Sequence, residues 1–322
     1  MLKYALKRIL IMIPILIGVI FIVFSINRMS PGNPVTALLS ADASAEQIAA
    51  KTAELGLDKP FLYQFFLYLK NLVLHFDMGQ SYYTGKDVAA EVLRRFPYTL
   101  VLGVSSVIIS LIIGIPFGII SATKQYSALD YTVTFLSLIL ASCPGFLFSL
   151  MLVLIFSVRL DWLPAAGVVT WKHWILPILA MGGYPIATIC RTTRSSMLEI
   201  VRQDYIRTAR AKGLSEFTVI KKHALRNALI PIIAITGLQL GFVIGGTIVF
   251  ESIFSIPGIG QYLMNSINNK DYNAVQGCVV FMSAFVCLMN LLTDIAYGFV
   301  DPRVRASYGG KKKKKTIKTK EA

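Results

Sequence analysis

Residues 204–231 read DYIRTARAKGLSEFTVIKKHALRNALIP, a basic and mostly polar run in a chain whose 322 residues are 55% hydrophobic. Long apolar stretches lie on both sides of it, and the one that follows, at 228–250, carries no charged residue. A helix needs about 20 apolar residues to cross the hydrocarbon core of a bilayer. The contrast predicts a loop between two membrane-spanning helices.

The composition also indicates a membrane protein. The mean hydropathy is +0.63 and 15% of the residues are charged, whereas soluble domains carry about 25%. The net charge of +15 is concentrated, because nine of the 32 Lys and Arg residues lie in 191–226 and nine more in 303–320. Basic patches beside apolar spans follow the positive-inside rule. We therefore expect these basic residues to lie beside a lipid bilayer and not to bind nucleic acid.

Six stretches are apolar enough to be transmembrane helices, at 9–26, 98–121, 131–158, 173–190, 228–250 and 272–300. The predicted fold class is all-α, a polytopic membrane protein with six transmembrane helices. An even number of spans places both termini on one side. The N-terminus, the 191–227 loop and the tail are basic, which predicts that they are cytoplasmic.

The spans divide the chain into four segments. Residues 1–28 hold the N-terminus and the first span, and 29–97 are predicted to form a small external helical subdomain. Within it, Ser44 and Gln47 have the spacing of a capping box, Gly56 ends that helix, and Pro60 starts another. Residues 98–300 form the five-span core with the cytoplasmic loop at 191–228, and 301–322 form a basic cytoplasmic tail. We expect the subdomain to pack on the membrane surface or on a partner.

The sequence contains no arrangement of residues typical of an enzyme. GQSYYTGKD at 79–87 lacks the spacing of a phosphate-binding P-loop, because five residues separate Gly79 from Gly85 and Asp87 follows Lys86. The four cysteines and three histidines have no metal-ligand spacing. We predict that this chain is not an enzyme and binds neither a cofactor nor a metal.

The opening stretch has the pattern of two helices joined by a tight turn. Asp204 is a good N-cap, and Gly213 is a natural stop that permits the positive φ of a left-handed turn. A second, amphipathic helix is expected to start at Ser215 and continue into the next span. In the first helix, Tyr205, Ile206 and Ala209 are expected to share one side.

This stretch resembles the cytoplasmic loop of ABC-importer permeases, in the branch that imports dipeptides, oligopeptides and nickel. Those loops read E-A-A, three residues, Gly, nine residues and I-x-L-P; here Arg207-Thr208-Ala209 stands in the E-A-A place, before Gly213. Where I-x-L-P would fall, this chain has 223–226, His-Ala-Leu-Arg, as is common in the peptide branch. The resemblance extends to LKRILIMIPILIGVIFIVFSINRMSPGNP near the start, FDMGQSYYTGKDVAAEVLRRFPYTL at 76–100, ESIFSIPGIGQYL at 251–263 and NLLTDIAYGFVDPRVR at 290–305.

The resemblance implies a type I ABC-importer permease fold in a bacterial or archaeal cell (inner) membrane. It implies a sister permease, usually a different chain so that the pair is a heterodimer, two P-loop ATPase subunits that bind ATP and Mg, and an external solute-binding protein. The loop would couple to an ATPase, with Ala209 on the docking face. The residues of this coupling helix and its turn are Asp204, Tyr205, Ile206, Arg207, Thr208, Ala209, Arg210, Ala211, Lys212, Gly213 and Leu214.

The cargo that the resemblance favours is a di- or oligopeptide. A permease for nickel or another small solute is the alternative within the same class. A self-contained carrier or a membrane scaffold is the alternative from another class, and neither would need a helix that binds an ATPase.

The fifth span contains the candidates for the translocation path. Its glycines at 237, 241 and 245 form a small-residue stripe that permits close helix packing, either within the chain or against the sister permease. Family permeases line their path with this span, so the predicted path residues are Thr236, Gln239, Gly241, Gly245 and Thr247. Asp294 is a charge inside the last span, for which we expect a structural partner, with substrate contact as the alternative.

Overall fold

The computed structural model describes residues 2–29, 44–54, 56 and 58–300. The regular secondary structure of these described residues is helical, apart from one isolated bridge between Gln80 and Asp87. The elements are α1 (Leu2–Met29), α3 (Ala45–Glu54), α4 (Phe61–His75), α5 (Val88–Thr123), α6 (Ala128–Ser142), α7 (Gly145–Leu152), the π-helix η1 (Val153–Arg159), the 3₁₀-helix η2 (Trp171–Trp174), α8 (Ile175–Val201), α9 (Asp204–Ala211), α10 (Glu216–Thr218), the π-helix η3 (Val219–Ala224), α11 (Leu225–Ile253), α12 (Ile259–Asn268) and α13 (Tyr272–Val300). The all-α prediction is confirmed, and the predicted tail at 301–322 lies outside the described residues.

Five helices are long and apolar enough to cross a membrane, and the bent pair of α6 with α7 and η1 makes up to six. The stretch predicted as a transmembrane helix at 131–158 is broken within this pair, because its two halves meet at 109°. The break lies at Cys143 and Pro144, and Cys143 is extended at φ −76° and ψ 121°. Proline disfavours helical geometry in the residue before it and lacks an N–H of its own, so the helix ends there.

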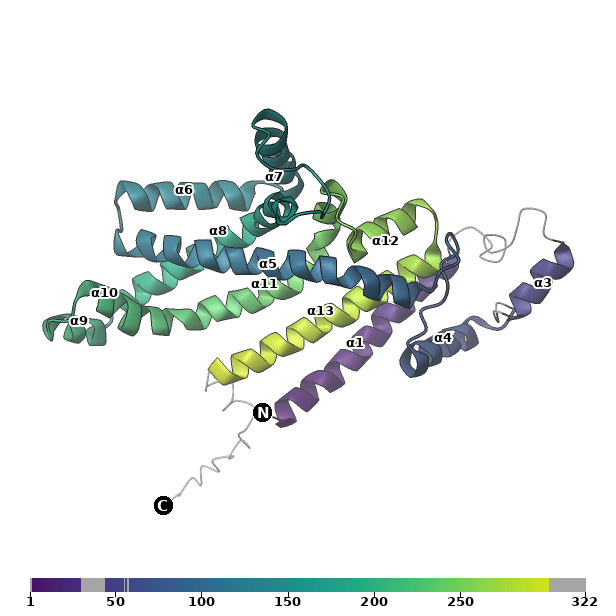
Figure 1. Ribbon diagram of the computed structural model, residues 1–322. Helices are drawn as coiled ribbons and strands as arrows, with labels where there is room; N and C mark the ends of the chain where they lie inside the picture. Colours follow the sequence, from purple (N-terminus) through teal and green to yellow (C-terminus); the bar gives the residue numbers. More distant parts are fainter. Residues whose placement is uncertain (1, 30–43, 55, 57, 301–322) are drawn as a thin grey trace, which may run out of the picture.

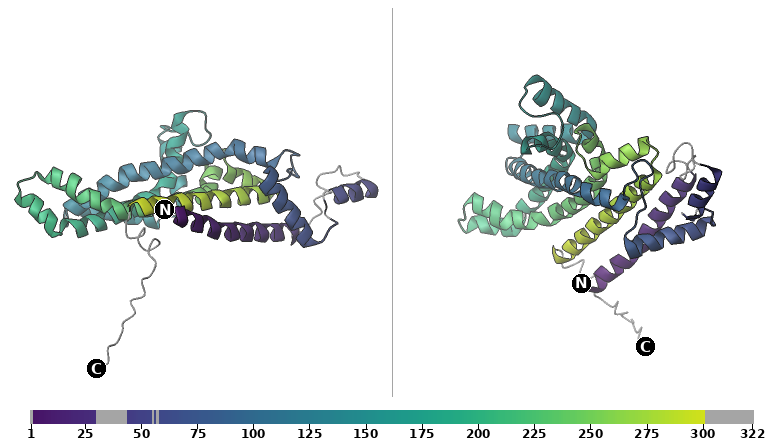
Figure 2. Two further views of the ribbon diagram at one scale, coloured as in Figure 1. Left: turned by 90° about the horizontal axis from the view of Figure 1, so that it is seen from below. Right: turned by 45° about the vertical axis from the view of Figure 1, so that its right-hand side comes forward.

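The long helices pack in a simple order (Figures 1 and 2). Helix α5 packs on α8, α8 on α11, α11 on α13 and α13 on α1. Helix α5 starts at Val88, so it continues through the predicted boundary at 97, and α8 continues to Val201, beyond the predicted end at 190. Together α9 and α10 lie at one end of the bundle, which we call the basic end.

Glycines allow two of these contacts. Gly114 and Gly118 bring α5 against α8, where an added Cβ at Gly118 would overlap Thr193. On α11, an added Cβ at Gly237 would overlap the Thr293 side chain of α13, and one at Gly241 would lie 2.7 Å from Oδ1 of Asn290. These two glycines therefore pack within the chain.

The helices of residues 44–75 have the caps and turns that their sequence predicts. Ser44 N donates to Oε1 of Gln47 (2.9 Å), and Gln47 N donates to Oγ of Ser44 (3.2 Å), which completes the capping box. Gly56 has φ +65°, and α4 begins directly after Pro60. Helix α4 packs on the end of α1 through an edge-on pair of Phe21 and Phe65 rings, 5.2 Å apart, and through other rings of both helices.

Two ion pairs fix polar side chains within the bundle. Asp130 at the start of α6 is buried and binds Arg194 of α8 through both oxygens, with N–O distances of 2.8 and 2.9 Å, and Ser121 of α5 donates to the same carboxylate. Near the basic end, Nη1 of Arg8 lies 3.1 Å from Oδ2 of Asp294. The structural partner expected for Asp294 is therefore Arg8, which joins α1 to α13.

The glycine contact makes a testable prediction about packing. We expect Gly237→Val to lower the stability of the purified chain by about 1–3 kcal/mol, because the added methyl groups overlap Thr293 and push α11 from α13. Gly245→Val is the matched control, since no atom lies within 4 Å of its added Cβ. Thermal unfolding in detergent measures both, and equal melting temperatures for the two variants would contradict the assigned packing.

Candidate coupling helix and translocation pocket

The basic end of the bundle is formed by the stretch that interrupts the apolar spans. Helix α9 follows α8 after a two-residue link, and α10, η3 and α11 then follow one another without a break from Glu216 to Ile253. Eight residues are too few for a helix that is stable by itself in water. Tertiary packing must therefore hold α9 in place.

The apolar side of α9 supplies this packing. Ile206 is fully buried and Ala209 is 6% exposed, and both belong to a cluster with Met197 of α8 and with Val219 and Ala224 of η3. The expected docking face is wrong in this respect, because Ala209 lies against the chain itself. Periodicity identified an apolar side of the helix, but it could not show whether that side packs on this chain or on a partner protein.

The opposite side of α9 is exposed. Successive residues of a helix are about 100° apart, so Asp204, Arg207, Thr208 and Ala211 share the face opposite Ile206. All four are exposed, and the Arg207–Asp204 pair on this face has an N–O distance of 4.0 Å. The other residues of the predicted coupling set, namely Tyr205, Arg210, Lys212, Gly213 and Leu214, are also exposed.

The turn after α9 has the geometry that its sequence predicts. Gly213 has φ +77°, which confirms the left-handed turn, and no atom lies within 4 Å of an added Cβ. Across the turn, the Glu216 carboxylate binds Arg210 at 2.7 and 3.1 Å and raises the pKa of that guanidinium. Nδ2 of Asn227 donates to the Tyr205 hydroxyl at 2.9 Å, which ties α9 to the start of α11. The turn is thus closed at both ends by side-chain contacts.

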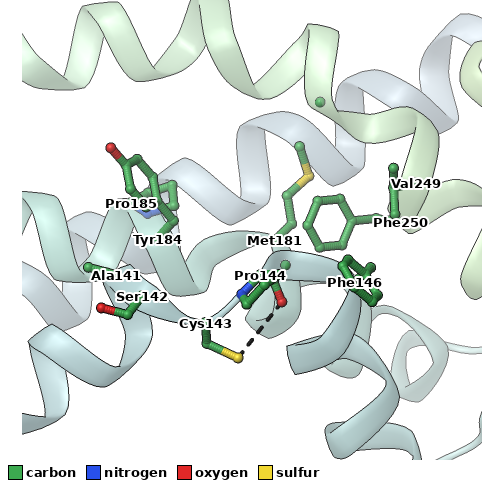
Figure 3. Close-up of a pocket in the computed structure, with 12 residues that line it drawn as sticks. Ala141, Ser142, Cys143, Pro144, Phe146, Met181, Tyr184, Pro185, Val249 and Phe250 are labelled. Carbon is green, nitrogen blue, oxygen red and sulfur yellow. Dashed lines mark hydrogen bonds between the residues drawn. The ribbon is translucent and has the colours of Figure 1, made fainter.

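A pocket of about 490 Å³ lies at the break between α6 and α7, and we call it the hinge pocket (Figure 3). Helix α8 contributes Met181, Tyr184 and Pro185 to it, and α11 closes it with Val249 and Phe250. None of the described residues that line it is charged. Such a surface suits apolar groups of a solute rather than an inorganic ion.

The predicted path residues of α11 divide between buried and exposed positions. Gln239 is 7% exposed and Thr247 is fully buried, while Gly241 packs on α13. Thr236 is half-buried, and its hydroxyl donates to the Ile232 carbonyl at 2.7 Å. Gly245 is exposed and open. Gly245 and Thr247 are the two neighbours in sequence of Gly246, which lines the hinge pocket.

Sequence reasoning missed the residues that organise this pocket. Periodicity gave no sign of the break at Pro144, although a proline in a long apolar run is itself a signal of one. It also missed Glu251, which is fully buried and accepts hydrogen bonds from Thr99 Oγ1 (2.7 Å) and from Gln261 N (3.0 Å). This carboxylate joins α5 to the start of α12, next to the end of α11 that closes the pocket.

Comparison with known families gives two matches. Residues 114–306 match the family described as binding-protein-dependent transport system inner membrane component, and residues 1–103 match the family of its N-terminal region. The dipeptide transport system permease protein DppB of Alkalihalophilus pseudofirmus is 41% identical, over 95% of this chain and 100% of that protein. The glutathione transport system permease protein GsiC of Escherichia coli K12 is 39% identical, over 95% of this chain and 99% of that protein.

Solved structures show the same fold. An inward-facing form of the MetNI methionine ABC transporter matches with a TM-score of 0.56 and 20% identity, over 65% of this chain and 96% of that chain. A chain of an amino acid ABC transporter crystallised with histidines matches with a TM-score of 0.51 and 12% identity, over 66% and 94% of the two chains.

The two sides of α9 predict different effects of one substitution. We expect Ala209→Asp to open the loop, because it buries an unpaired carboxylate in the cluster of Ile206 and Val219. Ala211→Asp is the matched control on the exposed side and should change stability by less than about 0.5 kcal/mol. Trypsin cleavage of the loop in membranes measures the difference, and equal cleavage rates would contradict the burial of Ala209.

Proposed function

Because the chain belongs to the family of binding-protein-dependent transport system inner membrane components, we propose that it is a permease subunit of an ATP-driven importer in which α9 binds an ATPase subunit. The observation that carries this proposal is the exposed face of α9, which is mounted on a buried apolar base and closed by a constrained turn. A short, rigid and polar helix outside the membrane is what a soluble partner needs in order to transmit force to the spans.

The partners of the proposal follow from the family. A sister permease forms the path together with this chain, two P-loop ATPase subunits bind ATP and Mg, and an external solute-binding protein delivers the cargo. The basic end and both termini face the cytoplasm of a bacterial or archaeal cell, as the charge distribution of the loops favours. Exposed apolar side chains of α11, such as Leu238 (56%) and Val249 (47%), are suited to cover by the sister permease beside the hinge pocket.

The proposed cargo is a di- or oligopeptide. Two relatives that cover 95% of the chain are named for dipeptide and glutathione transport, and glutathione is itself a small peptide. The uncharged hinge pocket suits cargo with varied side chains, because an apolar surface discriminates weakly between groups of similar size.

The first test is to identify what binds α9. The tagged chain carrying Ala211→Cys, expressed with its neighbours and treated with a thiol cross-linker, should become linked to a P-loop ATPase and co-purify with a second permease. Ser252→Cys is the control, since Ser252 is exposed at the other end of α11. Mass spectrometry identifies the linked chains. A homo-oligomer that never links to an ATPase would favour a self-contained carrier or scaffold instead.

The second test concerns the turn. We expect Gly213→Val to reduce transport at least about ten-fold while basal ATP hydrolysis continues, because a β-branched residue is strained at φ +77° and the turn must change. Gly213→Asn should retain coupling, since asparagine tolerates the left-handed region. Peptide uptake and ATP hydrolysis are measured on the same reconstituted transporter. Transport at the wild-type rate with Gly213→Val would contradict the proposed role of the turn in coupling.

A further inference from the structure

A second pocket lies on the same seam between α6 and α8 as the hinge pocket. It has a volume of about 300 Å³, and we call it the arginine pocket because Arg191 and Arg194 of α8 line it. Hydroxyl groups of Thr134 and Ser137 on α6 and of Ser195 on α8 line the same space. The same two helices therefore supply an apolar pocket at one level and a basic, hydroxyl-lined pocket at another.

One face of α8 connects the two pockets. Tyr184 belongs to the hinge pocket, as Figure 3 shows, whereas Arg191 and Ser195 belong to the arginine pocket. These positions follow the spacing of one helix face, with Thr188 between them. Arg191 lies seven positions after Tyr184, or about 10 Å along the helix axis. The arginine pocket is the nearer of the two to the basic end, because α8 leads to α9.

The two arginines differ in what they are free to bind. Arg194 is held by Asp130 in a two-point ion pair, and its Nε also donates to Ser121 at 3.0 Å. Arg191 is exposed and forms no ion pair with any carboxylate of the part of the chain that the structure describes. A guanidinium has five N–H donors in a planar fork that matches a carboxylate. Arg191 therefore presents an unused anion-binding group at the edge of the pocket.

We propose that Arg191 binds the C-terminal carboxylate of a peptide cargo on its way along the α6–α8 seam from the hinge pocket to the basic end. This inference rests on the proposed function. An extended peptide spans at most about 3.6 Å per residue, so three residues bridge the distance of about 10 Å between the pockets. The side chains of the cargo then contact the uncharged hinge pocket, while its carboxylate, which every unmodified peptide carries, meets Arg191 and the hydroxyls. Because Arg191 would bind the carboxylate that all such peptides share, this contact places no requirement on the side chains of the cargo.

A lipid phosphate is the other anion that the same guanidinium would bind. The hydroxyls around the pocket and its position on one seam with the hinge pocket favour a solute carboxylate. A headgroup at the membrane surface would need the charge but neither of these features. The experiment must therefore separate peptide from lipid.

The test is protection of a thiol placed in the arginine pocket. The complete transporter carrying Leu198→Cys, at a position that lines the arginine pocket without a hydroxyl, is reconstituted without the binding protein in phosphatidylcholine nanodiscs. Labelling of residue 198 by a thiol reagent is followed by mass spectrometry, which separates it from the native cysteines. Trialanine should slow labelling, and trialanine amide should not. With Arg191→Gln added, the half-protecting concentration of trialanine should rise about ten-fold, because charge-assisted hydrogen bonds are lost. Arg202→Gln is the matched control, since Arg202 is exposed directly after the end of α8 and lines neither pocket.

Each other outcome overturns the proposal. Equal protection by the peptide and its amide, or protection that survives Arg191→Gln, would exclude carboxylate recognition by Arg191. Protection that appears only when phosphatidylglycerol replaces part of the phosphatidylcholine, and not with trialanine, would assign the pocket to a lipid headgroup. Uptake of trialanine by cells with the wild-type chain distinguishes a failure of the proposed importer function from a failure of the inference about Arg191. If uptake occurs without carboxylate-dependent protection, the importer function stands and only this inference falls.

Discussion

The hydrocarbon core of a membrane offers no water to hydrogen-bond an exposed peptide group, so each backbone N–H and C=O must be satisfied within the protein. Helices meet this requirement by themselves, and the described part of the chain is built almost wholly from them. The same constraint governs polar side chains. Asp130 is buried and accepts hydrogen bonds from Arg194, Ser121 and the backbone N–H of Tyr126. Glu251 is buried and accepts hydrogen bonds from Thr99 and from a backbone N–H.

The helices are interrupted at the two places on which the proposed function depends. At Pro144 the span bends by 109° and leaves the hinge pocket between α6, α8 and α11. At Gly213 the backbone takes a left-handed turn that presents α9 outside the bundle. The first interruption comes from a proline, whose backbone is restricted, and the second from a glycine, whose backbone permits a positive φ.

The two places are physically connected through one helix. From Glu216 the chain is helical without a break through η3 and α11 to Ile253, so the residues that support α9 and those that close the hinge pocket belong to one continuous rod. Val219 and Ala224 hold α9 at the beginning of this rod, and Val249 and Phe250 line the pocket near its end. In the proposed importer, a displacement of α9 by an ATPase would therefore reach the pocket without crossing a flexible joint.

The sequence by itself determined the helical class, the apolar spans, the capping box at Ser44 and the turn at Gly213, because each of these depends on composition or on residues close together in the chain. Only the tertiary structure decided which side of each helix meets which neighbour. Ala209 turned inward to Val219, Gly241 turned to Asn290 of α13, and Asp130 found Arg194, which is 64 residues away. A helical period specifies that a helix has an apolar or a small-residue face. The neighbour against which that face packs is set by the three-dimensional arrangement of segments that are distant in sequence. For this reason the sequence misplaced Ala209 on the docking face.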